Sequence, residues 1–174
     1  MNTKIFISHK QEDSKKAEKV AEYIKRNYSF DVYVDTLDDG ITSTINITDR
    51  IVNKLRESTH LLVIFSEKTK GSMWVPFELG VSYEREQGIG VLVWTEYPLV
   101  LPEYLDQFPK LKVNKTYNSI DFKTNLNKYL NEIKKNPTKE ILMDSLDTES
   151  FNFNKTASEV NYAREFIKRL NYVL

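Results

Sequence analysis

The sequence contains no cysteine, which excludes disulfides, thiolate metal sites and cysteine nucleophiles together. It contains only two histidines, His9 and His60, too few for most zinc or iron sites that lack thiolates. We therefore expect no metal site. A chain without cysteine also suits the reducing interior of a cell, so we expect a cytoplasmic location.

Glycine is scarce as well, with five residues in 174. No Gly-x-Gly-x-x-Gly pattern follows an expected strand and no Gly-Lys-Ser/Thr segment occurs, so the usual phosphate cradles of dinucleotide and nucleotide sites are missing. No nucleophile-elbow motif is visible. The acidic pair of a receiver domain is also absent after the first expected strand, although Asp35 with Lys112 or Lys115 imitates a fragment of that pattern.

Neither sign of charge is in excess, because 25 Lys and Arg balance 25 Asp and Glu. Nucleic-acid binders usually carry a basic surplus, so the balance argues against that role.

No apolar run approaches the ~20 residues of a membrane span, and residues 1–4 lead into a strand-like segment without a signal-peptide core. With 40% hydrophobic residues, the chain can bury a real core. We expect a soluble protein that binds neither nucleic acid nor membrane.

Strand-like and helix-like segments alternate through residues 1–135. Short apolar runs predict strands at 4–8, 31–35, 60–66, 91–94 and, weakly, 111–113. Apolar residues at helical spacing predict a helix capped by Asp13, a second over 47–55, a third from Trp74 to near Gly88, and a closing helix over 122–133. Residues 99–109 contain two prolines and are expected to be irregular or briefly helical. This order predicts an open parallel sheet covered by helices on both faces.

Residues 136–174 are expected to form a linker and an amphipathic helix. Asn136 and Pro137 end the first unit, a short helix is suggested over 141–146, and a capping box stands at 156–159. An apolar stripe follows it at Val160, Ala163, Ile167 and Leu170. The stripe can pack on its own domain or on a partner, and the sequence leaves both open.

Ligands of such sheets bind beyond the carboxyl ends of the strands. Ser8, His9 and Lys10 stand at the first of these ends, Asp35 at the second and Ser66 at the third. Trp74 and Glu78 follow on one face of the next helix, because they are four residues apart. We expect Glu78 to lie in or near the first turn, where the helix dipole favours an ionised carboxylate. Such a carboxylate can bind ribose hydroxyls and stabilise positive charge as a glycosidic bond breaks.

Simpler interpretations exist for each of these residues. A glutamate in a first turn is more often a complement to the helix dipole, and a tryptophan at this spacing more often belongs to the core. His9 and Lys10 can be plain strand-exit residues. Periodicity alone therefore favours the structural interpretation over the catalytic one.

Four segments resemble the TIR (Toll/interleukin-1 receptor) domain family over about residues 3–135. Residues 4–13, Lys-Ile-Phe-Ile-Ser-His-Lys-Gln-Glu-Asp, are similar to the family's first box. Residues 31–35, Asp-Val-Tyr-Val-Asp, match the second strand, and residues 62–66 with the Ser-x-Trp-x-x-x-Glu-Leu pattern of 72–79 match the third strand and its box. The loop 35–40 departs from the family, because it lacks the Arg and Pro-Gly features of many signalling members.

The resemblance implies a flavodoxin-like sheet of five parallel strands, with residues 1–135 as the TIR domain and 136–174 as a helical extension. It implies that Glu78 is the catalytic glutamate of an enzyme that cleaves NAD between nicotinamide and ribose. Trp74 matches the edge of that pocket, and Ser8, His9, Lys10 and Asp35 are expected to bind the substrate. NAD is then the substrate, and no resident cofactor or metal is expected.

The short stand-alone architecture resembles the TIR protein of Thoeris anti-phage systems. This implies a linear, cyclic or conjugated ADP-ribose signal that reaches a separate effector by diffusion, and homo-oligomers formed through the TIR unit or the C-terminal helix. One rival hypothesis is a catalytically silent TIR module that works by protein–protein contact. A more remote one is a nucleoside-processing enzyme of similar fold that also uses one glutamate.

Overall fold

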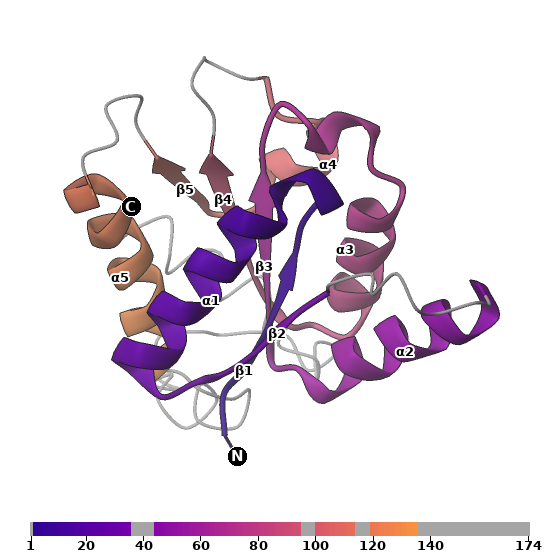
Figure 1. Cartoon of the computed structure of the whole chain (residues 1–174), viewed down its shortest axis with the longest axis horizontal. Helices are drawn as coiled ribbons and strands as arrows, with labels where there is room; N and C mark the ends of the chain where they lie inside the picture. Colours follow the sequence, from indigo (N-terminus) through magenta and orange to yellow (C-terminus); the bar gives the residue numbers. More distant parts are fainter. Residues whose placement is uncertain (1, 36–43, 95–99, 114–118, 136–174) are drawn as a thin grey trace, which may run out of the picture.

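The computed structural model describes residues 2–35, 44–94, 100–113 and 119–135. These residues form alternating strands and helices (Figure 1), in the order β1 (Lys4–Ser8), α1 (Ser14–Tyr28), β2 (Asp31–Val34), α2 (Thr44–Glu57), β3 (His60–Phe65), α3 (Trp74–Glu84), β4 (Gly88–Trp94), α4 (Glu103–Asp106), β5 (Lys110–Val113) and α5 (Ser119–Lys135). The helices predicted at 141–146 and after 156 lie outside the described residues. No helix in the described ranges is long and apolar enough to cross a bilayer.

The five strands form one sheet in the order β2-β1-β3-β4-β5, and every neighbouring pair is parallel. This confirms the predicted flavodoxin-like fold. The chain steps outward from β1 to β2 and then crosses back to β3 on the other side of β1. The carboxyl ends of β1 and β3 therefore flank a topological switch point, where open α/β sheets bind their ligands.

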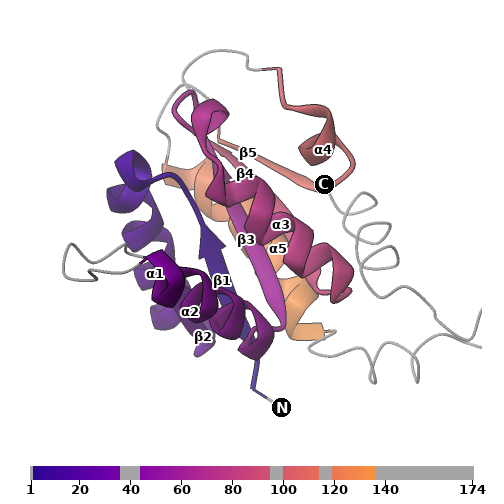
Figure 2. The ribbon, with the colours of Figure 1, turned by 90° about the vertical axis from the view of Figure 1, so that its right-hand side faces the viewer.

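Helices cover both faces of the sheet (Figures 1 and 2). On one face α1 and α5 pack over a buried cluster that includes Ile5, Ile7, Leu62 and Tyr129. On the other face α2, α3 and α4 cover a cluster that includes Phe6, Leu61 and Phe65. All six residues of β3 are buried, as its unbroken apolar run predicts.

The clearest difference from the sequence prediction is the connection between α3 and β4. The helix ends at Glu84, because Glu86 adopts a left-handed φ of 55° and turns the chain. Gln87 then anchors the turn, since its side-chain amide donates to the carbonyls of Leu55 and Ser58, each over 2.6 Å. As a result β4 begins at Gly88, three residues before the predicted start at Val91.

Asp13 precedes α1 as predicted, but its side chain makes no capping hydrogen bond. The residue is buried, and its carboxylate instead accepts a hydrogen bond from Ser66 Oγ over 2.5 Å and pairs with Lys16 Nζ at 2.8 Å. Asp13 therefore ties the start of α1 to the end of β3. Ser66, which follows the third strand, is fully buried in this contact and does not line the pocket next to Glu78.

Candidate active site

Glu78 is the fifth residue of α3, and only 2% of its surface is exposed. It was expected in or near the first turn, where the helix dipole favours an ionised carboxylate; it lies just beyond that turn, and its burial disfavours the ionised form. Burial raises the pKa of Glu78 to about 8, an effect opposed by a hydrogen bond from Ser8 and reinforced by the negative charge of Asp35. The helix begins at Trp74, where the Ser72 hydroxyl accepts a hydrogen bond from the Val75 amide over 3.3 Å. One further turn carries the Glu78 side chain inward against the strand ends.

Ser8 ends β1 and has no exposed surface. Its hydroxyl donates a hydrogen bond to Glu78 Oε2. The sequence placed Ser8 among the substrate-binding residues, and the contact that the structure gives it is with the carboxylate instead. Ser8 is not among the residues that line the adjoining pocket.

A pocket of about 430 Å³ opens above Glu78 at the carboxyl edge of the sheet. It brings together five of the six site residues predicted from the sequence, namely His9, Lys10, Asp35, Trp74 and Glu78. Gln11, Glu12, Gly71, Ser72 and Met73 complete the lining. Met73 is 85% exposed and forms part of the rim. The described residues contain no cluster of three or more potential metal-binding side chains.

His9 is 8% exposed, and its burial lowers the pKa of the imidazole. Burial therefore favours the neutral form of the ring. Its Nδ1 lies 3.4 Å from the Ile7 carbonyl oxygen, whereas Nε2 is buried and has no hydrogen-bond partner among the described residues. This environment suits His9 to a role as a neutral wall of the pocket and not as a cationic contact.

Asp35 follows β2 and is held by two neighbours. Arg50 on α2 places a guanidinium nitrogen 3.6 Å from Asp35 Oδ1, and the Tyr33 hydroxyl donates to the same oxygen over 3.3 Å. Burial, helped by the charge of Asp35, raises the pKa of Tyr33 to about 12, so this hydroxyl stays a neutral donor. Arg50 could not be predicted from the sequence, because one arginine among several charges on a helix carries no signal of its own.

Trp74 has two environments. Its ring packs against the buried cluster beneath α2 and α3, and it also lines the pocket. The Phe77 ring meets it edge-on, with centroids 5.7 Å apart and an interplanar angle of 85°. The indole is thus fixed by packing while part of it remains available to a ligand.

Solved structures and a family model are similar to this chain. No curated protein is similar in sequence. Among solved structures, the TIR domain of the Toll-related receptor TRR-2 from Hydra magnipapillata matches with a TM-score of 0.55 and 14% identity, covering 73% of this chain and 97% of that one. A 2-deoxyribosyltransferase from Bacillus psychrosaccharolyticus matches with a TM-score of 0.53 and 13% identity, covering 68% and 90%. The family model of the TIR domain matches residues 5–135, and the chain therefore belongs to the TIR domain family.

Proposed function

We propose that this TIR domain is an enzyme that cleaves NAD at the bond between nicotinamide and ribose. The observation that carries the proposal is the buried Glu78 carboxyl group, held by Ser8 at the wall of a pocket that also presents the Trp74 ring. A desolvated acid beside an aromatic ring is an arrangement suited to a flat cationic ring joined to a sugar.

The chemistry asks little of the enzyme beyond electrostatics. The nicotinamide ring of NAD is already cationic, so when the C1′–N bond breaks its electron pair goes to the ring nitrogen and nicotinamide leaves neutral. No proton donor is needed. Positive charge develops on C1′ and the ring oxygen of the ribose, and an ionised Glu78 stabilises it. Capture by water then gives ADP-ribose and one proton, whereas capture by a group of the same molecule or of another one gives a cyclic or conjugated product.

The raised pKa of Glu78 fits this role. With a value of about 8, the carboxyl group is mostly protonated in the empty pocket at neutral pH. A bound cationic ring favours the charged form of a nearby acid and so lowers this pKa. Binding of NAD therefore promotes loss of the proton and creates the charge where the transition state requires it. A charge formed in a buried site also interacts more strongly than one in water.

The other lining residues have roles that follow from their chemistry. Trp74 stacks on the nicotinamide ring, and Lys10 places an amino group at the partly exposed rim, where it can meet the phosphates of NAD. Asp35 and His9 contact the ribose from the strand ends. Ser8 is a positioning residue, because it acts through Glu78.

We further propose that the product is a diffusible ADP-ribose derivative that activates a separate effector in anti-phage defence. This finer proposal rests on the resemblance to Thoeris TIR proteins. The 2-deoxyribosyltransferase with a similar fold makes base exchange on deoxynucleosides a rival activity for the same pocket, and a silent interaction module is the other rival.

Mass spectrometry of the products separates these functions. The purified chain is incubated with NAD, and in parallel with a deoxynucleoside and a second base. Free nicotinamide from the wild type and from Glu22→Gln, an exposed control on α1, but not from Glu78→Ala, supports the proposal. Base release from the deoxynucleoside alone identifies the transferase. A wild-type chain that is inert in both reactions yet self-associates is an interaction module.

A further inference from the structure

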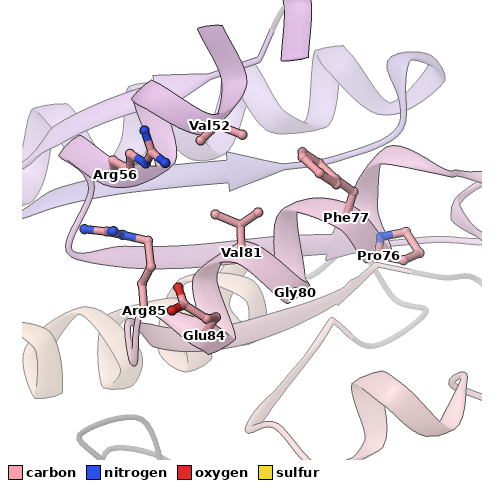
Figure 3. A pocket seen from close by; sticks show the side chains of 8 residues that line it. All are labelled: Val52, Arg56, Pro76, Phe77, Gly80, Val81, Glu84 and Arg85. Atoms are coloured by element: carbon pink, nitrogen blue, oxygen red, sulfur yellow. The ribbon is translucent and has the colours of Figure 1, made fainter. Parts of the chain in front are cut away.

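A second pocket, of about 490 Å³, lies between α2 and α3 (Figure 3). We call it the α2/α3 groove. Its apolar lining comes from Val52 on α2 and from Pro76, Phe77 and Val81 on α3, and Gly80 adds no side chain. Phe77 is 37% exposed. Exposed apolar grooves of this kind commonly mark an interaction site.

The groove has a charged end. Arg56 and Arg85 lie together at one end of it, and Phe77 and Pro76 lie at the other (Figure 3). Both arginines are exposed, and neither forms an ion pair with a residue in the described ranges. Glu84 is the one acidic residue in the lining. The groove therefore suits an apolar segment that carries several acidic residues.

Such a segment occurs in the same chain, shortly after α5. Residues 139–149 read Lys-Glu-Ile-Leu-Met-Asp-Ser-Leu-Asp-Thr-Glu, with four acids among aliphatic residues and one lysine. The last stretch of the chain is a poorer match, because Arg164, Lys168 and Arg169 bear the same charge as the arginines of the groove. Charge thus selects residues 139–149 over the amphipathic stripe that follows them.

Topology places the start of this segment near the groove. Helix α5 follows β5 and packs on it, so its end at Lys135 lies at the edge of the sheet where the strands begin. Arg56 and Arg85 precede β3 and β4, so they lie at the same edge. The groove is on the opposite face, but the seven residues 136–142 span up to ~23 Å when extended. The chain can therefore pass round this edge.

We propose that residues 139–149 dock in the α2/α3 groove of their own chain. Leu142 and Leu146, four residues apart in the sequence, cover the surface of Phe77 and Val81, and the acidic side chains meet Arg56 and Arg85. The docked segment contacts Phe77, whose ring packs on the Trp74 ring of the active-site pocket. The C-terminal extension is thereby joined to the wall of the candidate site.

Disulfide trapping in the full chain tests this, because the native sequence has no cysteine and each introduced pair is the only one present. Gly80→Cys is suitable in the groove, since a Cβ there meets no atom within 4 Å. It is combined with Ser145→Cys between the two leucines. One control pairs Ser145→Cys with Lys19→Cys, an exposed position on α1 across the sheet, and another pairs Gly80→Cys with Ser158→Cys.

In a glutathione redox buffer, Gly80→Cys with Ser145→Cys is expected to close an intramolecular disulfide at least ~10-fold faster than either control, because docking raises the effective concentration. Adding Arg56→Glu and Arg85→Glu should bring the rate down to that of the controls. Equal rates in all three pairs overturn the proposal, as does a faster rate with Ser158→Cys. A disulfide-linked dimer overturns it too, by identifying a second copy as the occupant.

Discussion

The hydroxyl of Ser8 donates a hydrogen bond to the carboxyl group of Glu78, although the two residues are 70 positions apart in the chain. Ser8 ends β1, and Glu78 lies on α3, the helix that follows β3. The hydrogen bond therefore connects the carboxyl ends of the neighbouring strands β1 and β3 at the switch point of the sheet. Both side chains are almost completely buried. The contact therefore fixes a carboxyl group whose ionisation is disfavoured by its surroundings.

Glu78→Gln is expected to reduce turnover of NAD by ~10²–10³-fold, the usual effect of removing one electrostatic contact to a transition state. The amide keeps the volume of the side chain and can still bond Ser8, so binding should change far less than kcat. Steady-state kinetics of nicotinamide release measure this, with Glu22→Gln as the control. Turnover within a few-fold of wild type would remove Glu78 from the mechanism.

Ser8→Ala is expected to shift the pH dependence of kcat/KM. The hydrogen bond from Ser8 favours the charged form and lowers the pKa of Glu78, so its loss raises that pKa. Because the ionised form is active, the acidic limb of the profile should move to higher pH. Ser82→Ala provides a matched control, since Ser82 is also fully buried on α3 but lies outside the pocket. A lower rate with an unmoved limb would mean that Ser8 contributes only to packing.

Burial of Glu78 should also make folding stability depend on pH. Its pKa rises from the ordinary 4.5 to about 8 on folding, so between these values the unfolded chain releases a proton that the native chain keeps. Stability from this group is therefore lost as pH rises through that range, by ~3–5 kcal/mol at ~1.4 kcal/mol per pH unit. Glu78→Gln should gain this amount over wild type between pH 5 and pH 8.5 in urea unfolding.

The difference between the two chains isolates Glu78, because other titrations are common to both. His60, whose pKa is lowered to about 3 by burial, acts in the opposite direction and destabilises both chains as pH falls below its ordinary 6.5. A stability difference between mutant and wild type that stays constant from pH 5 to pH 8.5 would show that Glu78 is ionised throughout.

The fold could be predicted because its signal is local. Unbroken apolar runs such as 60–65 indicate buried parallel strands, and helical spacing indicates the helices between them. The start of β4 was misplaced because Gly88 and Gly90 disfavour a strand locally, whereas pairing of residues 88–90 with β3 enforces it. Pairing with a neighbouring strand determines where β4 begins, and a short window of sequence does not contain the residues of that neighbour.

The sequence predicted which residues line the candidate site better than it predicted the burial and ionisation of those residues. Strand ends and the four-residue spacing of Trp74 and Glu78 identified half of the pocket lining. Spacing does not reveal what covers a side chain, so the burial of Glu78 and its raised pKa were missed. The same limit explains Asp13, whose partner Ser66 comes from 53 positions further along the chain.

Trp74 is expected to report ligand binding by fluorescence. The chain has two tryptophans, and Trp94 packs against the buried cluster on the opposite face of the sheet. With Trp94→Phe, titration of nicotinamide should quench the remaining Trp74 saturably, because the electron-poor ring stacks on the indole. With Trp74→Phe, Trp94 should show no saturable quenching. Trp74→Ala should weaken binding of NAD by ~1–3 kcal/mol, the usual range for stacking on an aromatic residue. Equal quenching of both tryptophans would argue against stacking in this pocket.

Gly90 should tolerate no side chain, because β4 passes directly beneath the ring of Tyr129. A Cβ at this position would lie 2.5 Å from Tyr129 Cε2 and 2.9 Å from Cζ, and Tyr129 is itself fully buried. Gly90→Ala is therefore expected to lower the free energy of unfolding by ~1–3 kcal/mol, the usual cost of overpacking a core.

Gly80→Ala is the matched control on the exposed side of α3, where a Cβ meets nothing within 4 Å and alanine should add ~1 kcal/mol of helix stability. Chemical denaturation of the two variants should thus give changes of opposite sign. If Gly90→Ala were as stable as wild type, the close packing of α5 on the centre of the sheet would be wrong.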